Sequence, residues 1–440
     1  MSENILEQNN IETVKKKVSF HTMGCRLNFS ETGSIVSEFM DRGYETVEFG
    51  EAADVVFINT CTVTDSADSS ARHLIRKAVQ SSPEGKIVVA GCYAQMEPEA
   101  IKKIEGVDYI LGTSEKFNIF KYLDDDSQLE AKLDHHQNCW GAATSLGDGH
   151  TRAFLKIQDG CNYVCSFCII PFARGRSRTI SVQDAILNAQ KLVDQGFKEI
   201  VLTGVNIGEY ESKSGEKLST LVRKLAEIKG LQRLRLSSVE PNTFTDELLL
   251  ALKETGIYQN HFHIPLQSGS NEILSSMKRK YLIEDYQKVI ARVLGYFPKA
   301  SIGADIIVGY PGETETHFEE TKTFLENSSI THFHLFPYSK RKNTAATRMT
   351  NHLSQIVKKE RLKILEKIGQ EKLEQKAKSM IGKTTTVLLE NKNHQGLWQG
   401  YTSEYFRVSI PVDSDKDFKN QIKTIQIMSS SKDQLFGEIK

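Results

Sequence analysis

Three cysteines close together in the sequence, Cys161, Cys165 and Cys168, have the spacing C-x3-C-x2-C, and no fourth cysteine follows them. A zinc site would need a fourth Cys or His ligand nearby, and a bacterial ferredoxin-type run would continue with another cysteine. A third interpretation is a [4Fe–4S] cluster held by three thiolates, whose remaining iron is open to S-adenosylmethionine. An electron from such a cluster can break the sulfonium C–S bond and release a 5′-deoxyadenosyl radical. The spacing therefore favours radical chemistry.

Three further cysteines each stand just past an apolar run: Cys25 ends VSFHTMGC, Cys61 ends DVVFINTC and Cys92 ends KIVVAGC. The carboxyl ends of the strands in an open parallel sheet share one edge, where ligands gather. These three thiols could therefore converge on one point, although free cysteines are often simply buried as small apolar side chains. The seventh cysteine, Cys139, lies in the polar stretch DHHQNC and matches neither set of three, so we predict no role for it.

The elements that must position these cysteines follow an α/β pattern, because apolar β-branched runs alternate with helical stretches from Val18 onward. The first segment predicts an open parallel sheet. After a polar linker come six strand-like runs, separated by helix-like stretches such as VQDAILNAQKLVDQ: FLKIQ, EIVLTG, RLRLSS, HFHIPL, ADIIVG and HFHLFP. Six units are too few for a complete eight-stranded barrel, so they predict an open, partial barrel whose strand ends face a shared cavity.

The last part of the chain changes character. A charged helix is expected over residues 354–379, with Val357, Ile364 and Ile368 on one face. Beyond Ile381, the short strand-like pieces TTTVLLE, YFRVSIPV and QIKTIQIM predict a small all-β domain. The expected division is therefore an N-terminal domain, a linker, a central barrel domain and a C-terminal β-domain, with the ranges 16–127, 128–146, 147–378 and 379–440.

The 440-residue chain balances 56 basic against 56 acidic residues, so any contact with nucleic acid must come from local patches. The N-terminal stretch MSENILEQNNIETVKKK lacks the apolar core of a signal peptide, and nowhere do 18 apolar residues run together. We therefore expect a cytosolic protein that does not contact membranes. In that reducing compartment, cysteines in patterned contexts indicate metal binding or reactivity rather than a disulfide framework.

The cysteine motif at the end of a strand, with Phe167 directly before Cys168, resembles the radical S-adenosylmethionine superfamily. The segments TMGCRLNFSET, NTCTVTDSA, GCYAQ and RAFLKIQDGCNYVCSFCIIPFARGRSR are similar to the methylthiotransferase family, and the similarity runs from about Val18 to the end of the chain. This resemblance implies two [4Fe–4S] clusters, one on each set of three cysteines. It also implies that the C-terminal β-domain is TRAM-like and is used on RNA.

The resemblance further implies a pocket for S-adenosylmethionine at the strand ends LTGVN, SSVEP and HIPLQSGS. Here LTGVN departs from the Gly-Gly-Glu-like motif that these enzymes often carry. The expected cofactor contacts are Thr203, Gly204, Asn206, Ser237, Glu240 and Gln267. Without the cluster motif, glycines and serines after strands would be interpreted as the residues that commonly form turns and loops.

The family mechanism implied by the resemblance uses S-adenosylmethionine twice. One molecule methylates a sulfur on the auxiliary cluster, and another generates the radical that lets the methylthio group replace an adenine C2 hydrogen. Ordinary acid–base catalysis cannot do this, because that carbon offers neither an acidic proton nor a leaving group. We therefore assign no side-chain acid or base, and we expect a tRNA substrate and an electron donor such as flavodoxin or ferredoxin.

Around its first cysteine the chain reads TMGCRLN. Relatives that act on threonylcarbamoyladenosine in tRNA have lysine at the position of Arg26, so this residue keeps the positive charge of that group. The resemblance is therefore closest to that group, which acts next to the anticodon. Isopentenyl-modified adenosine in tRNA and an aspartate of a ribosomal protein are the alternative substrates within the family. A non-catalytic iron–sulfur protein that binds RNA or senses redox state is the alternative outside it.

The charge of Arg26 has a chemical counterpart, because the threonylcarbamoyl group carries a carboxylate and the isopentenyl group is apolar. A guanidinium binds a carboxylate through two hydrogen bonds. We hypothesise that Arg26, or one of Arg174, Arg176 and Arg178, recognises the modified base, the alternative being that these arginines meet only phosphates. The runs Lys278–Tyr281 and Tyr338–Lys342 place aromatic beside basic residues, as RNA contacts would require, although such runs are usually solvated surface.

Overall fold

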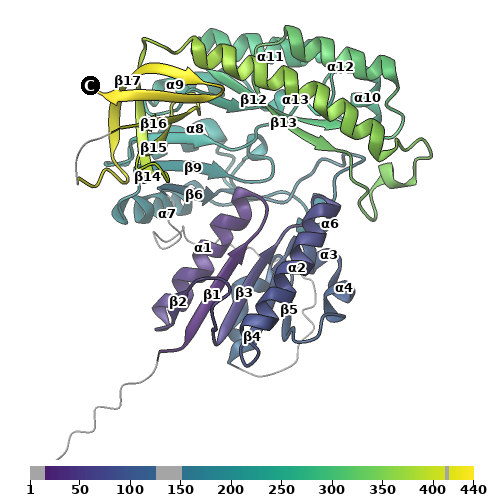
Figure 1. Ribbon diagram of the computed structural model, residues 1–440, viewed down its shortest axis with the longest axis vertical. Coiled ribbons are helices and arrows are strands. Elements are labelled where there is room, and N and C mark those ends of the chain that lie inside the picture. Colours follow the sequence, from purple (N-terminus) through teal and green to yellow (C-terminus); the bar gives the residue numbers. More distant parts are fainter. Residues whose placement is uncertain (1–14, 125–150, 412–415) are drawn as a thin grey trace, which may run out of the picture.

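The computed structural model describes residues 15–124, 151–411 and 416–440. These residues form an N-terminal body, a central barrel and a small C-terminal body, in chain order. Figure 1 shows the N-terminal sheet and its helices below a central barrel, with the yellow C-terminal strands beside that barrel. Cys139 and the expected linker 128–146 lie outside the described residues. In the described ranges, no helix has both the length and the apolar composition needed to cross a membrane.

The N-terminal body is built on a parallel sheet that has, within the described residues, five strands in the order β2-β1-β3-β4-β5. They are β1 (Lys17–Thr22), β2 (Glu45–Val47), β3 (Val55–Thr60), β4 (Lys86–Gly91) and β5 (Tyr109–Leu111). Strand β3 reads VVFINT and is buried over its whole length, as parallel strands covered on both faces are. The three apolar runs of the sequence thus form the three central strands.

The helices of this body begin at one edge of the sheet. They are α1 (Arg26–Asp41), α2 (Asp65–Ser81), α3 (Cys92–Met96), α4 (Pro98–Lys102) and α5 (Ile119–Leu123). The Thr64 hydroxyl caps α2 by accepting a hydrogen bond from the backbone N–H of Ala67. Because α1, α2 and α3 each follow a central strand within a few residues, their N-termini gather at the edge where the cysteines stand.

Two parallel sheets, β10-β9-β6 and β11-β12-β13, form the wall of the central barrel. An isolated bridge between Leu234 and Tyr258 joins them. In chain order the strands are β6 (Arg152–Lys156), β9 (Glu199–Thr203), β10 (Arg233–Leu236), β11 (His261–His263), β12 (Ser301–Val308) and β13 (Ile330–Pro337). The described residues therefore confirm an open barrel of six strands.

Helices cover the outside of this barrel and share one apolar core with it. They are α7 (Val182–Asp194), α8 (Leu218–Ala226), α9 (Asp246–Glu254), α11 (Ile283–Tyr296) and α12 (Glu315–Asn327), with the short α6 (Ile170–Arg174) and α10 (Asn271–Ser276) near the strand ends. A small hairpin of β7 (Gln158–Asp159) and β8 (Arg178–Thr179) brackets the loop that carries Cys161, Cys165 and Cys168.

Helix α13 (Gln355–Lys378) confirms the expected charged helix, but the predicted face is partly wrong. Ile364 is exposed, whereas Lys358, Arg361 and Leu365 are buried. The two cations are buried because they have partners: Lys358 Nζ donates to the carbonyl of Tyr338 at 2.9 Å, and Arg361 Nη1 donates to the carboxylate of Glu313 at 2.6 Å.

The C-terminal residues form a closed barrel in the order β14-β15-β16-β18-β17, which confirms a small, TRAM-like all-β domain. The strands are β14 (Thr384–Lys392), β15 (Trp398–Thr402), β16 (Arg407–Ile410), β17 (Ile422–Ser431) and β18 (Gln434–Ile439). The sequence pattern missed β15 and β18, each of which contains a glycine. A Cβ at Gly400 would lie 2.1 Å from the carbonyl oxygen of Leu388, so close packing of neighbouring strands requires glycine there.

Candidate functional site

The first set of cysteines lies at the carboxyl edge of the N-terminal sheet. Cys25 is the N-cap residue of α1, Cys61 directly follows β3, and Cys92 is the first residue of α3. All three line one pocket of about 400 Å³, as do the barrel residues Thr203 and Ser237. The parallel sheet therefore brings three thiols that are distant in sequence to a single site facing the barrel.

The glycine before Cys25 is required by this arrangement. Gly24 has φ +91°, and a Cβ built on it would lie 2.6 Å from the Cβ of Cys61 and 2.7 Å from its Sγ. No other residue type fits so close to Cys61 without displacing it. The turn between β1 and α1 is thus shaped by the neighbouring cysteine.

The second set of cysteines lies in the loop bracketed by β7 and β8. The backbone N–H of Tyr163 donates to Cys161 Sγ at 3.3 Å, and Arg279 Nη1 donates to Cys165 Sγ at 3.2 Å. Cys168 lines a second pocket of about 220 Å³ together with Phe167. Donors that point at sulfur stabilise negative charge there, as thiolate ligands require.

In the protein alone these thiols resist ionisation. Burial raises the pKa of Cys161 to about 11, and it raises the pKa of Cys61 and of Cys168 to about 12. Thiolates therefore need an added positive charge, which a metal centre supplies when it binds.

The two sets of cysteines were compared with the geometry of a single-ion site. Within the described ranges, no three His, Cys, Asp or Glu side chains lie close enough together to hold one metal ion. Zinc binds sulfur at about 2.3 Å, so its ligands must crowd around one point. Cys25, Cys61 and Cys92 line one pocket together, and cysteine thiolates are the ligands of [4Fe–4S] clusters.

The predicted cofactor residues fall in two places. Thr203, Gly204 and Ser237 line the pocket that also contains Cys25, Cys61 and Cys92, whereas Gln267 lines the pocket of Cys168. The buried Ser237 hydroxyl has no hydrogen-bond partner among the described residues, so it can bind a ligand in the pocket.

The other two predicted cofactor residues, Asn206 and Glu240, are not among the residues that line these two pockets. Asn206 is buried, and its backbone N–H donates to Gln158 Oε1 at 2.9 Å. Glu240 forms an ion pair with Arg279, the residue that also donates to Cys165. Burial raises the pKa of Glu240, while Arg279 opposes that rise. Glu240 therefore reaches the cysteine site through Arg279.

Sequence reasoning missed the apolar wall of the second pocket. Ile307, Phe336, Pro337 and Tyr338 line it beside Phe167 and Cys168. Flat apolar walls suit an aromatic ring such as adenine. The signal in the sequence is the aromatic end of the run HFHLFP followed by Tyr338, a residue that its basic neighbours make resemble an RNA contact.

The two basic and aromatic runs have structural partners instead. Arg341 donates to Asp68 at 2.7 Å and to the carbonyl of Thr62 at 3.1 Å, so it joins the barrel to the N-terminal body. Tyr281 is buried and donates to the carbonyl of Leu266 at 2.8 Å. The prediction that these runs contact RNA is therefore wrong for Arg341 and Tyr281, whose polar groups are already engaged inside the protein.

The four candidate arginines differ in their surroundings. Arg26 lines the pocket of Cys25, and its Nη2 donates to the hydroxyl of Tyr405 at 3.2 Å. Arg174 also borders this pocket, but it is 1% exposed and donates to Glu31, Asp159 and Asn28. Arg174 is therefore unsuited to binding a substrate carboxylate, because its donors already have acceptors.

The remaining two candidate arginines lie further along the same loop. Arg178 donates to Asp159 at 3.2 Å and to the carbonyls of Arg174 and Arg176. Arg176 is exposed. Of the four arginines, Arg26 is thus the one that lines the pocket of Cys25 and forms no ion pair with another described residue.

Histidines from two strands complete the pocket wall. His263 and His334 line it, with their ring centroids 4.9 Å apart, and His263 Nε2 lies 3.0 Å from Asp305 Oδ1. Burial lowers the pKa of His334, and the neighbouring His263 lowers it further. Another histidine, His261, stacks on the ring of Tyr405 with the ring centroids 4.9 Å apart. The pocket wall therefore carries two imidazole rings that can form hydrogen bonds with a ligand.

Comparison with known proteins agrees with this geometry. Residues 17–112 match the family model described as "Uncharacterized protein family UPF0004", and residues 155–325 match the radical SAM superfamily. The superfamily match implies S-adenosylmethionine and a [4Fe–4S] cluster.

Several curated relatives match along most of the chain. Threonylcarbamoyladenosine tRNA methylthiotransferase MtaB of Bacillus subtilis is 38% identical, with 94% of each chain covered. The protein of the same name from Aquifex aeolicus is 38% identical over 86% of this chain and 93% of its own. The tRNA-2-methylthio-N(6)-dimethylallyladenosine synthase of Syntrophus aciditrophicus is 33% identical over 88% of this chain and 87% of its own.

Solved structures share the fold at low sequence identity. The radical S-adenosylmethionine methyltransferase TsrM of Kitasatospora setae, solved with cobalamin and a [4Fe–4S] cluster, superposes with a TM-score of 0.54 at 16% identity. That match covers 73% of this chain and 75% of TsrM. At this identity the likeness supports the arrangement of the strands and no more.

Proposed function

The chain belongs to the radical S-adenosylmethionine tRNA methylthiotransferases, and we propose that it converts N6-threonylcarbamoyladenosine next to the anticodon of tRNA to its 2-methylthio form. The observation that supports this most is the shared pocket of Cys25, Cys61 and Cys92, which also contains barrel residues and Arg26. A centre on these cysteines would face the same space as a nucleoside that enters the barrel.

We propose that each set of cysteines holds a [4Fe–4S] cluster. Cys161, Cys165 and Cys168 would hold the one that binds S-adenosylmethionine, and Cys25, Cys61 and Cys92 the auxiliary one. When bound, these groups supply the electron, the radical and the methylthio sulfur. The chain's own residues position and shield them. Arg279 donates to Cys165, the wall of Phe167 and Phe336 accepts an adenine ring, and Ser237 offers its hydroxyl in the shared pocket.

Arg26 is our proposed reader of the threonylcarbamoyl carboxylate. One of its donors is directed at Tyr405, and a guanidinium carries five N–H donors in a planar fork, so the others are sufficient for a bidentate contact. This contact would distinguish the threonylcarbamoyl from the isopentenyl substrate, which has no carboxylate.

The substrate is tested by nucleoside mass spectrometry of tRNA from a strain that lacks this protein. We expect loss of 2-methylthio-threonylcarbamoyladenosine alone, restored by the wild-type chain and not by a Cys92→Ala variant. Loss of the 2-methylthio-isopentenyl nucleoside instead would assign the chain to the substrate of its dimethylallyladenosine relatives. An unchanged tRNA profile would point to a protein substrate.

Anaerobic reconstitution separates the enzyme from a sensor. Two four-iron clusters require about eight irons per chain, together with reductive cleavage of S-adenosylmethionine when a donor such as flavodoxin or ferredoxin is present. A chain that binds iron without cleaving S-adenosylmethionine would be a redox-sensing or RNA-binding protein. A tRNA substrate also favours a cytosolic location, and we keep the domain ranges 16–127, 147–378 and 379–440 as the proposed division.

A further inference from the structure

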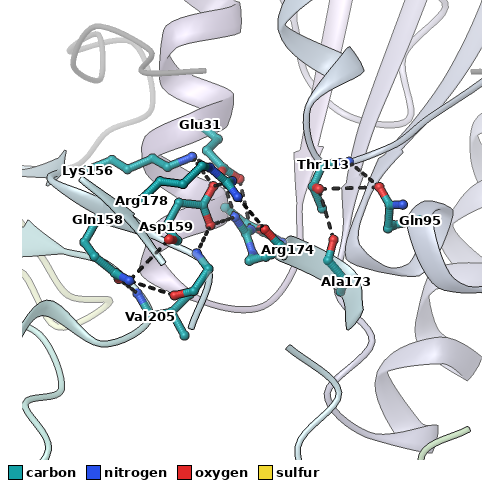
Figure 2. A network of polar contacts seen from close by, with 12 residues as sticks. Glu31, Gln95, Thr113, Lys156, Gln158, Asp159, Ala173, Arg174, Arg178 and Val205 are labelled. Carbon is teal, nitrogen blue, oxygen red and sulfur yellow. Dashed lines mark hydrogen bonds and ion pairs between the residues drawn. The ribbon is translucent and has the colours of Figure 1, made fainter. Parts of the chain in front are cut away.

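A group of charged side chains lies buried between the N-terminal body and the cysteine loop of the barrel. We call it the junction cluster, and its members are Glu31, Lys116, Lys156, Asp159, Arg174 and Arg178. Figure 2 shows Lys156, Arg174 and Arg178 pointing toward Glu31 and Asp159. The carboxylate of Glu31, on α1, lies 2.6 Å from Lys116 Nζ, 2.7 Å from Lys156 Nζ and 2.8 Å from Arg174 Nη1.

The junction cluster contains more positive than negative charge. Among the described residues, its ion pairs join four cations to two carboxylates. The side chains of Glu31, Lys116, Lys156 and Arg174 are at most 2% exposed. Burial lowers the pKa of Lys116, while Glu31 opposes this. The three buried cations, Lys116, Lys156 and Arg174, therefore face two carboxylates, and Arg178 adds a fourth, partly exposed positive charge. Buried excess charge costs several kcal/mol unless a counter-charge lies nearby.

The excess positive charge faces the first set of cysteines. Arg174 lines the same pocket as Cys25, Cys61 and Cys92. Its guanidinium is held by Glu31, Asp159 and Asn28 at 2.7 to 3.1 Å, and these hydrogen bonds fix its position at the pocket. Figure 2 also shows a second tie at α6, where Thr113 donates to the carbonyl of Ala173 at 3.1 Å.

We infer that Arg174, supported by Lys116, is the electrostatic counter-charge of the auxiliary centre on Cys25, Cys61 and Cys92 and raises its reduction potential. The inference rests on the proposed function, which places a cluster there. A cluster with three thiolates carries net negative charge, and reduction adds one more. A fixed cation in a dry site therefore favours the reduced form.

The test isolates the auxiliary centre. In a chain with Cys161→Ala, Cys165→Ala and Cys168→Ala, the midpoint potential of the remaining cluster is measured by a redox titration followed by electron paramagnetic resonance. Arg174→Gln and Lys116→Gln remove positive charge, whereas Arg174→Lys keeps it. Arg178→Gln is the matched control, because Arg178 pairs with the other oxygen of Asp159 and with backbone carbonyls, away from the cysteine pocket. Iron content is measured for every variant.

We expect a lower midpoint potential in Arg174→Gln and in Lys116→Gln, recovery in Arg174→Lys, and the parent value in Arg178→Gln. If Arg174→Gln fails to fold or to retain iron, Lys116→Gln decides the question: a lowered potential supports the inference and an unchanged one overturns it. Equal potentials in Arg174→Gln and Arg178→Gln would also overturn it and leave the proposed function intact. A parent chain that holds no cluster would instead contradict the proposed function.

Discussion

Arg26 lines the pocket of Cys25, Cys61 and Cys92, and it also donates a hydrogen bond to Tyr405 of the C-terminal body. We expect Arg26→Gln to lower kcat/KM on threonylcarbamoyl-tRNA by about 10- to 100-fold, since a hydrogen bond to a charged group contributes about 1.5–3 kcal/mol. Cleavage of S-adenosylmethionine should continue while less of the methylthio product is formed. Both are measured by liquid chromatography and mass spectrometry.

The exposed Arg176, on the cysteine loop, provides the matched control for Arg26. Arg176→Gln should retain nearly full turnover at moderate salt, because an exposed cation contributes little unless it is ordered by a partner. An Arg26→Gln variant as active as Arg176→Gln would show that the carboxylate is bound elsewhere.

Glu31 is the carboxylate on which the ion pairs of the junction cluster converge. Replacing it by glutamine leaves Lys116, Lys156 and Arg174 without their main counter-charge, so we expect a loss of about 3–5 kcal/mol in the free energy of unfolding. Glu38 lies on the same helix with its side chain 40% exposed, and Glu38→Gln should change stability by less than about 0.5 kcal/mol. Thermal unfolding followed by circular dichroism compares the two, and equal melting temperatures would contradict the prediction.

Low pH should reduce the contribution of the junction cluster to the stability of the fold. Burial alone would raise the pKa of Asp159, but Lys156 and Arg174 lower it to about 2. A carboxyl whose folded pKa is depressed stabilises the fold above its ordinary value near 3.9, and that contribution disappears as the pH falls through the folded value. We therefore expect the melting temperature to fall from about pH 4 to about pH 2. The decrease should be shallower in Asp159→Asn, and parallel profiles would contradict this assignment.

The turn between β1 and α1 gives a prediction at the level of elements. Gly24→Ala would place a methyl group 2.6 Å from the Cβ of Cys61 and should displace that thiol. We expect the iron content after reconstitution to fall from about eight to about four per chain, because one of two four-iron clusters is lost.

Gly43 provides the control, since it also has a positive φ, +84°, and an added Cβ meets nothing within 4 Å. Gly43→Ala has similar backbone strain and should keep both clusters. If both variants lost iron equally, strain rather than contact with Cys61 would be the cause.

The elements were predictable where one physical signal dominated. β1, β3 and β4 are apolar runs that end in Cys25, Cys61 and Cys92, and the parallel register of the sheet is sufficient to bring those ends together. The face of α13 was not predictable, because Lys358 and Arg361 are buried by partners that belong to distant segments. The partners of Arg341 and Arg279, Asp68 and Glu240, were not predictable for the same reason. A basic residue in the sequence gives no sign of whether its counter-charge will be a carboxylate of the fold or solvent.

The phenol of Tyr405 contacts all three bodies of the molecule, because it lies in the C-terminal barrel and binds residues of the other two. Tyr405 of the C-terminal barrel accepts hydrogen bonds from Arg152 at 2.8 Å and from Arg26 at 3.2 Å. Burial would raise the pKa of Tyr405, but Arg152 and Arg26 lower it. Tyr405→Phe keeps the ring that stacks on His261 and removes the acceptor. We expect a folded chain whose KM for threonylcarbamoyl-tRNA rises while cleavage of S-adenosylmethionine is retained.

Tyr401 serves as the comparison for this variant. It stacks on Tyr405 with centroids 4.9 Å apart, and Arg407 lies 5.4 Å from the centre of its ring. Tyr401→Phe preserves both contacts, which involve the ring, and should leave the KM near that of the wild type. If Tyr405→Phe behaved like Tyr401→Phe, the phenol oxygen would have no part in positioning Arg26.

The contacts of the C-terminal barrel, including the loop that carries Tyr405, predict how substrate specificity changes when this barrel is exchanged between relatives. Arg235 donates to the carbonyls of Thr402 and Ser403, and Thr151 and Arg152 donate to Glu390. The C-terminal barrel is thus joined by hydrogen bonds to the strands β6 and β10 of the central barrel. A chimera that receives this barrel from an isopentenyl-specific relative would inherit part of that relative's substrate preference along with its surface for tRNA.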